Sequence, residues 1–341
     1  MDKKWYELNG TYGDVIISTR IRLARNIEEY PFPIKCSAEQ QQKITDKVKN
    51  AVLNSNSVIA PRFNFIDMNG ISATEKISMV ERHLVSPEFI SDQNSKKGLL
   101  LLDDESVSIM INEEDHIRLQ VMNEGLELEK AYETAARLDT LLDESLSFAF
   151  SQNLGYLTQC TTNLGTGMRA SVMLHLPALQ NGKAIRKLSE NLAKLGLTIR
   201  GTYGEGSEPI GALYQLSNRI SLGISEKTAI DNLKNIAMQL ASQELAARAE
   251  MNKHISVQDV IYRSEGILKS ARLITNAEAM KHLSFVRSGI TSGLIDNISL
   301  DTVNKLMVDI QPATLMCKAG KQLSSQERDE IRAKIIRKEL A

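Results

Sequence analysis

A stretch of seven residues between two apolar runs carries the side chains for chemistry on a charged group. It runs from Asn112 to Arg118 and holds three adjacent acids, a histidine and an arginine. If the apolar run that begins at Ile117 is a strand, alternation places Glu114 and Arg118 on its polar face. An acid and a guanidinium that project from one sheet face suit a charged substrate. A solvated hairpin tip is the alternative interpretation.

Further arginines lie at predicted strands or where these strands join loops. With Arg118 the set is Arg20, Arg22, Arg118, Arg169 and Arg200. Guanidiniums on one sheet face repel one another unless a polyanion neutralises them, and each binds phosphate oxygens bidentately. Glu114 and Glu205 do not suit a bare triphosphate, so they would face Mg²⁺ or a cationic acceptor. With the glycine-rich stretch 201–206 as a lid, the set indicates phosphoryl transfer to a positively charged group. For the single segments, a basic solvated strand and a surface turn are the alternatives.

Periodicity predicts the elements that must position these residues. Strands are predicted at 15–23, 63–65, 99–102, 106–111, 117–121, 170–176 and 198–200, and helices at 37–55, 72–84, 126–152 and 178–195. On the first strand, alternation puts Ile17, Ile21 and Leu23 on the core face. The short polar turns between residues 99 and 121 make antiparallel pairs rather than βαβ crossovers.

Helical periodicity without a competing strand pattern dominates from Glu226 to the end of the sequence. A domain boundary is therefore expected near residue 225. The predicted fold is α+β, with an antiparallel β-sheet flanked by helices in residues 1–225 and a helical C-terminal domain in residues 226–341.

The composition excludes several classes of function. A net charge of −1 with 24% charged residues gives no overall field that would favour nucleic acid. Cys36, Cys160 and Cys317 are far apart and form no C-x-x-C pair, which argues against disulfides or structural zinc and for a reducing compartment. The N-terminus has no apolar signal core, and no apolar run is long enough to span a membrane. A cytoplasmic protein with no membrane partner is expected.

Four short motifs within residues 15–225 carry a family resemblance. They are Ser18-Thr19-Arg20-Ile21-Arg22, Asn112 to Arg118, Cys160-x-Thr162-Asn163-Leu164-Gly165-Thr166 and Arg200-Gly201-Thr202-x-Gly204-Glu205. In this order they resemble the motifs of the phosphagen (guanidino) kinases, and most closely those of bacterial protein arginine kinases of the McsB type. The resemblance implies a catalytic antiparallel sheet flanked by helices, which transfers the γ-phosphoryl group of Mg-ATP to a guanidinium nitrogen.

The resemblance also implies a role for each matching residue. The phosphates of ATP would be held by Ser18, Arg20, Arg22, Arg118, Arg169 and Arg200. Glu114 would align the acceptor guanidinium and help to remove its proton, and Glu205 would be the second carboxylate. Cys160 would lie near the acceptor as a thiol or thiolate that tunes it. Glu113 would approach Mg²⁺ through water.

The sequence departs from the family pattern at three places. Free-guanidine kinases carry a helical domain of about a hundred residues, a typical size for a small domain, before the Ser-Thr-Arg motif. Here that motif begins at Ser18, so the domain is expected to be absent, which suits an acceptor arginine on a protein chain. Tyr203 stands where small-substrate relatives usually have Arg, and Thr161 stands where Pro is usual.

The helical end of the sequence carries a motif of its own. Ser324 and Glu327 form a capping box, and Arg328, Asp329 and Arg332 follow in the first turns behind it. A solvated helix face is the alternative interpretation of this spacing. In protein arginine kinases a similar R-D-x-x-R-A motif implies a phosphoarginine-sensing pocket. There the aspartate would contact the guanidinium and the two arginines the phosphate.

The resemblance predicts an ATP-dependent protein arginine kinase that acts on exposed arginines of proteins. It further implies a homodimer, allosteric regulation, and a role in stress response through marking proteins for a Clp-type protease. An activator protein and a transcriptional repressor are the other implied partners. A kinase of a free guanidine such as arginine, and a non-catalytic phosphoarginine-binding adaptor, are the alternatives.

Overall fold

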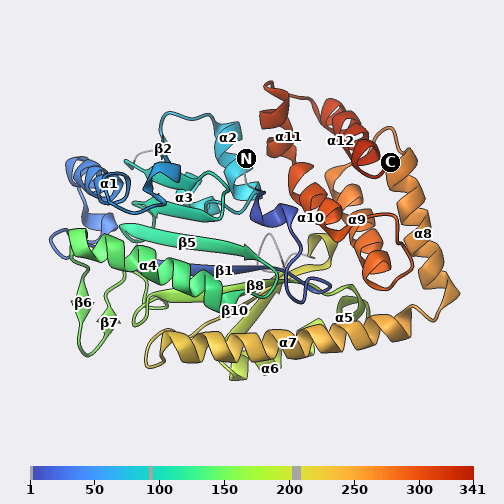
Figure 1. The fold of residues 1–341 in the computed structure, drawn as a ribbon, viewed down its shortest axis with the longest axis horizontal. Helices are drawn as coiled ribbons and strands as arrows, with labels where there is room; N and C mark the ends of the chain where they lie inside the picture. The colour runs from blue at the N-terminus through green and yellow to red at the C-terminus, as the bar shows by residue number, and fades with distance from the viewer. Residues whose placement is uncertain (1–2, 92–94, 202–208) are drawn as a thin grey trace.

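An eight-stranded sheet forms the centre of the protein in the computed structural model, which describes residues 3–91, 95–201 and 209–341 (Figure 1). Its strands stand in the order β2-β3-β4-β5-β1-β8-β10-β9. They are β1 (Ile16–Arg25), β2 (Phe63–Asp67), β3 (Gly98–Leu102), β4 (Val107–Ile111), β5 (Ile117–Glu124), β8 (Met168–His175), β9 (Leu197–Gly201) and β10 (Leu213–Asn218). Every neighbouring pair is antiparallel, and β6 (Phe150–Ser151) pairs with β7 (Gly155–Tyr156) in a separate hairpin. The predicted antiparallel sheet is confirmed.

Helices surround this sheet, and those beyond α7 gather together beside it (Figure 1). The helices before the last strand are α1 (Ala38–Leu53), α2 (Ala73–Glu81), α3 (Pro87–Ser91), α4 (Leu128–Leu146), α5 (Pro177–Asn181) and α6 (Ile185–Lys194). After it come α7 (Glu226–Met251), α8 (Ile255–Ser270), α9 (Asn276–Thr291), α10 (Leu300–Asp309), α11 (Pro312–Ala319) and α12 (Ser325–Glu339). The spacings of Ser37 with Gln40, Ser72 with Glu75 and Ser324 with Glu327 in the sequence predict capping boxes, and all three are confirmed. No helix of the described residues is long and apolar enough to cross a membrane.

The main hydrophobic core lies on one face of the sheet. Its helical side chains come from α1 (Ile44, Val48, Val52), α4 (Ala131, Ala135, Leu138, Leu142, Leu146) and α7 (Ala229, Ile230, Leu233, Ala237, Leu240). Each set recurs every three or four residues and therefore forms one stripe on its helix. These helices pack on the face that carries Ile21 and Leu23 of β1. Because strand residues alternate, the side chains of Arg20 and Arg22 point to the opposite face.

Three sequence-based predictions about single elements are wrong. The helix expected to reach residue 152 ends at Leu146, where Ser147 takes a positive φ of 52°. The helix expected at 178–195 is divided into α5 and α6. Strand β10 was not expected, and it lies between β8 and β9 within the sheet. Buried side chains such as Tyr214, Leu216 and Ser217 lie on both of its faces, so its sequence lacks the alternation of a half-buried strand.

Ile17 also lies on a different face from the one expected. The pairing of β1 with β8 shifts register between Ile16 and Ser18, as at a β-bulge. As a result Ile16 joins the main core, while Ile17 packs with Met173 against the apolar cluster of the C-terminal helices.

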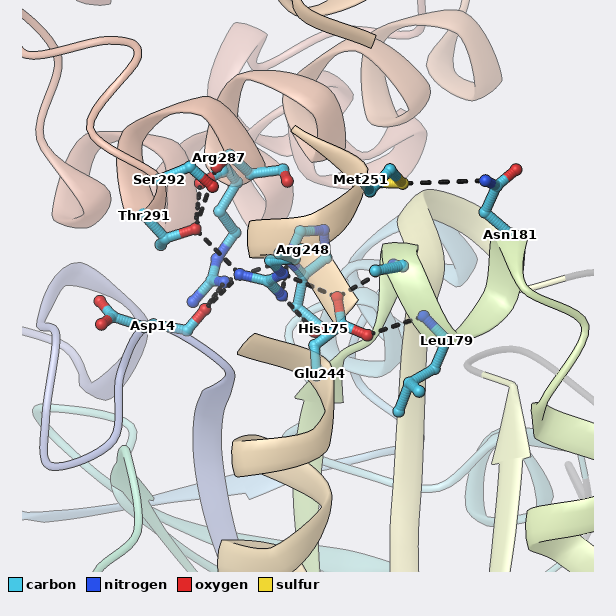
Figure 2. A network of polar contacts seen from close by, with 12 residues as sticks. Asp14, His175, Leu179, Asn181, Glu244, Arg248, Met251, Arg287, Thr291 and Ser292 are labelled. Carbon is cyan, nitrogen blue, oxygen red and sulfur yellow. Dashed lines mark hydrogen bonds and ion pairs between the residues drawn. The ribbon is translucent and has the colours of Figure 1, made fainter. Parts of the chain in front are cut away.

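Two buried arginines join the sheet to the C-terminal helices (Figure 2). Arg248 of α7 forms an ion pair with Glu244 (2.7 Å). It also donates hydrogen bonds to the carbonyl oxygens of Asp14 (3.0 Å) and His175 (2.6 Å). Arg287 of α9 donates to the same oxygen of Asp14 (2.9 Å). Buried guanidiniums are tolerated here because carbonyl and carboxylate oxygens accept their hydrogen bonds. Burial and these two cations lower the pKa of His175 far below its ordinary value, and its Nδ1 lies 3.2 Å from each of them.

A carboxylate of α2 caps one of the C-terminal helices. Glu81 accepts hydrogen bonds from the backbone N–H groups of Ala313 (2.9 Å) and Thr314 (2.7 Å) and from the Thr314 hydroxyl (2.8 Å). The first N–H groups of a helix lack partners within it and carry a partial positive charge, so a carboxylate stabilises the start of α11. α2 is thereby fixed to the C-terminal helices. The division into two domains at residue 225 stays a prediction. α7 packs on the sheet, while α8, α9, α10 and α12 share a second core.

Candidate active site

A cleft of about 1050 Å³ opens on the sheet face that carries Arg20 and Arg22. Strands β1, β5, β8, β9 and β10 form its floor, and the segment between α2 and α3 forms part of its wall. Two further segments reach it, namely the turn between β4 and β5 and the loop after β7. The polar lining includes Arg20, Arg22, Ser86, Glu113, Glu114, Arg118, Gln159, Cys160, Asn163, Arg169, Arg200 and Gln215. The structure therefore brings five predicted arginines, both acids of the 113–114 pair and Cys160 to one cleft.

Sheet register explains how distant arginines meet. β1 lies between β5 and β8, and Arg22 stands directly opposite Arg169 on β8. On the other side, Arg118 of β5 pairs with Ala24, two residues along from Arg22. Arg200 of β9 stands opposite Gln215 of β10. Four strands, β1, β5, β8 and β9, thus aim guanidiniums at the same space.

Among the described residues, Arg20, Arg22 and Arg169 form no ion pair with an acid. Arg20 donates to neutral oxygens, at 2.9 Å from Gln215 Oε1 and 3.4 Å from Ser171 Oγ. Within the part of the chain that the structure describes, the buried Nε atoms of Arg22 and Arg169 have no hydrogen-bond partner.

Burial and crowding of like charges also disfavour the protonated guanidiniums. Burial, together with the charges of Arg118 and Arg169, lowers the pKa of Arg20 to about 9. The same causes place the pKa of Arg22 well below its ordinary value, and burial lowers that of Arg169. A bound polyanion would supply the missing acceptors and reverse these shifts.

Two acids of the cleft, Glu113 and Glu114, lie in the tight turn between β4 and β5 and have different partners. Glu113 forms an ion pair with Arg118 and accepts a hydrogen bond from Ser86 Oγ (2.6 Å). Burial would raise the pKa of Glu113, but the charge and hydrogen bond of Arg118 and the bond from Ser86 outweigh it, so the pKa lies below its ordinary value. Glu114 has no such cation among its described contacts and accepts from Asn163 Nδ2 at 3.3 Å. Glu114 is therefore available for a cationic ligand.

Cys160 lies on the loop that follows β7, partly exposed and 3.0 Å (Sγ to Oγ1) from Thr162. The loop is held against the segment after β10, because Ser221 Oγ donates to the carbonyl oxygens of Thr162 and Leu164, each at 2.8 Å. Gly165 adopts a φ of 106°, and a Cβ there would lie 2.4 Å from the carbonyl oxygen of Ser221. Only glycine permits this close approach.

The remaining predicted residues lie elsewhere. Ser18 is buried and lines a smaller neighbouring cavity together with Trp5 and Asn304 rather than the cleft. Glu205 lies outside the described residues. A residue set for direct metal binding is absent from the described ranges, which hold no group of three or more His, Cys, Asp or Glu that could ligate an ion. Glu113 alone beside the arginines fits a magnesium ion that keeps most of its waters and binds chiefly to phosphates.

The C-terminal motif lies on α12, where its two arginines have separate contacts. Arg332 is buried and donates to the carbonyl oxygens of Ile310 (3.0 Å) and Ile274 (2.9 Å), and it pairs with Asp329 (2.5 Å). Arg328 is half-buried, and its guanidinium donates to the carbonyl oxygen of Leu323 at 3.0 Å. Asp329 and Arg328 are thus the accessible members of the motif.

Several lining residues of the cleft were missed by sequence reasoning. Ser86 follows the helix predicted at 72–84, and no local pattern in the sequence signals its contact to Glu113. Gln215 belongs to β10, which was not expected. Asn163 lay within a quoted motif, but its contact to Glu114 depends on two segments that meet only in the folded chain.

Comparisons with known proteins agree with this geometry. Residues 43–247 match the family model of the ATP:guanido phosphotransferase C-terminal catalytic domain, and residues 254–341 match that of the protein-arginine kinase McsB C-terminal domain. The protein-arginine kinase of Brevibacillus brevis is 43% identical over 98% of this chain and 94% of its own length. That of Halothermothrix orenii is 45% identical over 98% of this chain and 96% of its own.

Solved structures support the fold. A lombricine kinase matches 69% of this chain and 68% of its own with a TM-score of 0.62 and 24% identity. The duplicated taurocyamine kinase from Schistosoma mansoni matches 87% of this chain and 49% of its own with a TM-score of 0.63 and 24% identity. Together with the relatives that match along almost the whole chain, these findings show that the chain belongs to the protein-arginine kinase family of the ATP:guanido phosphotransferases.

Proposed function

We propose that the protein transfers the γ-phosphoryl group of Mg-ATP to the guanidinium groups of arginines in other proteins. The observation that carries this proposal is the unbalanced charge of the cleft. Arginines on four strands face a space in which the buried Nε atoms of Arg22 and Arg169 lack acceptors among the described residues. Glu114 in the same space lacks a cation among its described contacts. A nucleoside triphosphate would supply acceptors for the arginines, and an acceptor guanidinium would supply a cation for Glu114.

The arginines would hold the nucleotide phosphates and stabilise the charge of the transferring group. Arg20, Arg22, Arg118, Arg169 and Arg200 present forked donors that match phosphate oxygens. Such donors, fixed in place by the sheet, need no reorganisation during the reaction. Ser18 lies on β1, two residues before Arg20, and would act from the neighbouring cavity.

Glu114 would orient the acceptor and take up its proton. A guanidinium with a pKa above about 12 is a poor nucleophile until a carboxylate aligns it and removes charge. As the nitrogen–phosphorus bond forms, the bond from the γ-phosphorus to the bridging oxygen of ADP breaks, and the departing proton passes to the carboxylate. Glu205 is proposed as the second carboxylate, and Cys160 as a thiol beside the acceptor.

Mg²⁺, when bound, would neutralise part of the negative charge on the phosphates of ATP. Glu113 is the residue proposed to meet its water shell. In the structure Glu113 is held by Ser86 and by Arg118, which places a carboxylate next to the phosphate-binding arginines. The same contact keeps the pKa of Glu113 low, so the group is ionised.

An assay with a generic basic protein tests the proposed function. Incubation with Mg-ATP is expected to put phosphate on arginine, and a phosphoramidate of this kind is labile in acid and stable in base. Mass spectrometry of the product would locate the modified side chain. Free arginine, tested in parallel in a coupled assay, is expected to be a poor acceptor. Efficient turnover of free arginine with an unmodified protein would contradict the proposal, and no turnover of either would favour the adaptor alternative.

We further propose that α12 senses phosphoarginine. Arg328 and Asp329 are the accessible members of the motif, whereas Arg332 also holds the backbone around residues 274 and 310 together. Arg328→Ala is expected to weaken binding of phosphoarginine about 10-fold or more, the effect of losing one charge-assisted hydrogen bond. Calorimetry with free phosphoarginine measures this.

Arg332→Ala is expected to lower both phosphoarginine binding and the melting temperature, because its buried contacts are structural. Arg337 lies on the same helix and donates to the carbonyl oxygen of Ala271. Arg337→Ala is therefore a matched control, since it removes an arginine with a backbone contact that lies outside the motif. Unchanged phosphoarginine affinity in both Arg328→Ala and Arg332→Ala would refute the sensing site.

The proposal extends to the setting in which the kinase acts. Its three cysteines are free thiols, in keeping with the reducing cytoplasm. We propose a homodimer under allosteric control, with an activator protein, a transcriptional repressor as a substrate, and delivery of marked proteins to a Clp-type protease during stress. The family membership supports this proposal, and co-purification of marked proteins with the protease tests it.

A further inference from the structure

Asp115 follows the two acids of the cleft in the same turn, yet it points away from the cleft and is 2% exposed. One of its oxygens, Oδ1, accepts two hydrogen bonds. The donors are Asn26 Nδ2 (2.7 Å) and the backbone N–H of Gln159 (2.7 Å). Gln159 immediately precedes Cys160. A buried side chain of the acidic turn is thus joined directly to the loop that carries the thiol.

Asn26 closes this connection from a third segment. Its Nδ2 also donates to the carbonyl oxygen of Leu157 (3.0 Å), and its Oδ1 accepts from the backbone N–H of His116 (2.9 Å). The end of β1, the acidic turn and the loop after β7 therefore meet at one small polar cluster. His116 extends it, since its ring Nδ1 accepts from the backbone N–H of Ile27 (3.0 Å).

The other end of the acidic turn is anchored independently. Asn112 adopts a positive φ of 61°, and its Nδ2 donates to the carbonyl oxygens of Gln41 (2.9 Å) and Lys96 (2.7 Å). Between these two anchors, only Glu113 and Glu114 face the cleft. The distance from Glu114 to the Cys160 loop is thus set by two contacts, one from Asn163 to Glu114 and one from the backbone of Gln159 to Asp115.

We infer that Asp115, through Asn26 and Gln159, is a positioning residue that fixes Glu114 and the Cys160 loop at the spacing the acceptor guanidinium requires. This inference rests on the proposed function, since it gives the cluster a part in aligning the acceptor. The nucleotide arginines lie on the strands of the sheet and do not depend on this cluster. Loss of the cluster therefore affects the acceptor side of the reaction and leaves nucleotide binding intact.

Substitution of Asp115 separates positioning from charge. Asp115→Ala removes both hydrogen bonds and is expected to lower kcat 10- to 100-fold, the loss typical of a misplacement of about 1 Å, with the KM for ATP within about twofold of wild type. In Asp115→Asn the amide oxygen still accepts from both donors, so kcat is expected to stay within about threefold of wild type. Asn26→Ala combined with Asp115→Ala is expected to cost little more than either alone.

A thiol assay reports on the loop without relying on activity. The rate at which iodoacetamide alkylates Cys160, followed by peptide mass spectrometry, is expected to change severalfold in Asp115→Ala and not in Asp115→Asn. Cys317, exposed and remote, is the internal reference. Asp104→Ala is the matched control, since Asp104 caps the neighbouring hairpin through Ser106 N–H (2.9 Å) without reaching the cleft. It is expected to lower the melting temperature only.

Two outcomes would overturn the inference. One is a wild-type kcat in Asp115→Ala, or a loss of kcat matched by an equal rise in the KM for ATP. The other is an Asp115→Asn variant as impaired as Asp115→Ala, which would make the charge and not the hydrogen bonds responsible. If the wild-type protein phosphorylates no arginine, the proposed function fails, while the alkylation rates still decide whether Asp115 positions the loop.

Discussion

Glu114→Gln is expected to reduce phosphoryl transfer to a protein arginine by about 10²- to 10⁴-fold, the range that general base catalysis contributes. The amide is nearly the same size, and it can still accept the hydrogen bond that Asn163 donates to Glu114 Oε2 (3.3 Å). The neutral amide cannot hold the charged acceptor guanidinium in place, and it cannot accept the proton that the guanidinium loses. The loss should therefore appear in kcat. Fixed-time assays of phosphate incorporation into a basic protein substrate measure this loss of kcat.

Binding of ATP should survive in Glu114→Gln, because the phosphates are assigned to arginines on the sheet. The affinity for ATP is expected to stay within about threefold of wild type, or to rise slightly as a negative charge leaves the cleft. Glu133→Gln, which removes the same charge from the exposed face of α4, is the matched control. Near-normal turnover in Glu114→Gln would end the role proposed for this carboxylate.

Arg22→Met is expected to remove at least about half of the stabilisation by ATP, while leaving the protein without nucleotide at least as stable as wild type. Its guanidinium lies across from Arg169, its Nε has no acceptor among the described residues, and its pKa is lowered by burial and by its cationic neighbours. Removing one such charge relieves repulsion of about 1 kcal/mol or more. Loss of a charge-assisted contact to phosphate weakens nucleotide binding about 10- to 100-fold.

Arg25→Met supplies the contrast, since Arg25 ends the same strand. Arg25 is buried in an ion pair with Asp139 (2.8 Å), donates to the carbonyl oxygen of Thr166 (3.0 Å) and stacks 3.4 Å from the ring centre of Tyr156. Its removal leaves Asp139 buried without a partner, and breaking such a pair costs about 3–5 kcal/mol. Arg25→Met is therefore expected to lower the free energy of unfolding, with or without ATP.

Denaturant unfolding with and without nucleotide measures both variants. At about 100 times its Kd, ATP adds about 2.7 kcal/mol to the free energy of unfolding of the wild type. Because the affinity of Arg22→Met for ATP is expected to be about 10- to 100-fold lower, the gain at the same ATP concentration should fall to about 0.4–1.4 kcal/mol. It should persist in full in Arg25→Met, provided that variant folds. A strong loss of stability in Arg22→Met without nucleotide would show that Arg22 holds the fold together, and the phosphate role would have to be abandoned.

Local patterns in the sequence determined much of this protein. Capping boxes at Ser37, Ser72 and Ser324 depend on residues three apart, and all three form as expected. The antiparallel hairpins of β3, β4 and β5 follow from short polar turns between apolar runs. The family motifs likewise named the arginines and acids that the fold gathers in one cleft. Each of these signals lies within a few residues of chain, where propensity and periodicity decide the outcome.

Contacts between distant segments were decided only by the tertiary structure. Arg22 and Arg25 look alike in the sequence, but one faces an open cleft and the other meets Asp139, 114 residues away. Ile17 lies on the other face of the sheet because of a bulge. β10 is a strand because β8 and β9 pair with it along both of its edges. Asp115 and His116 gain partners from β1 and from the loop after β7. Whether a polar group is satisfied depends on which segments fold against it, and no local pattern contains that information.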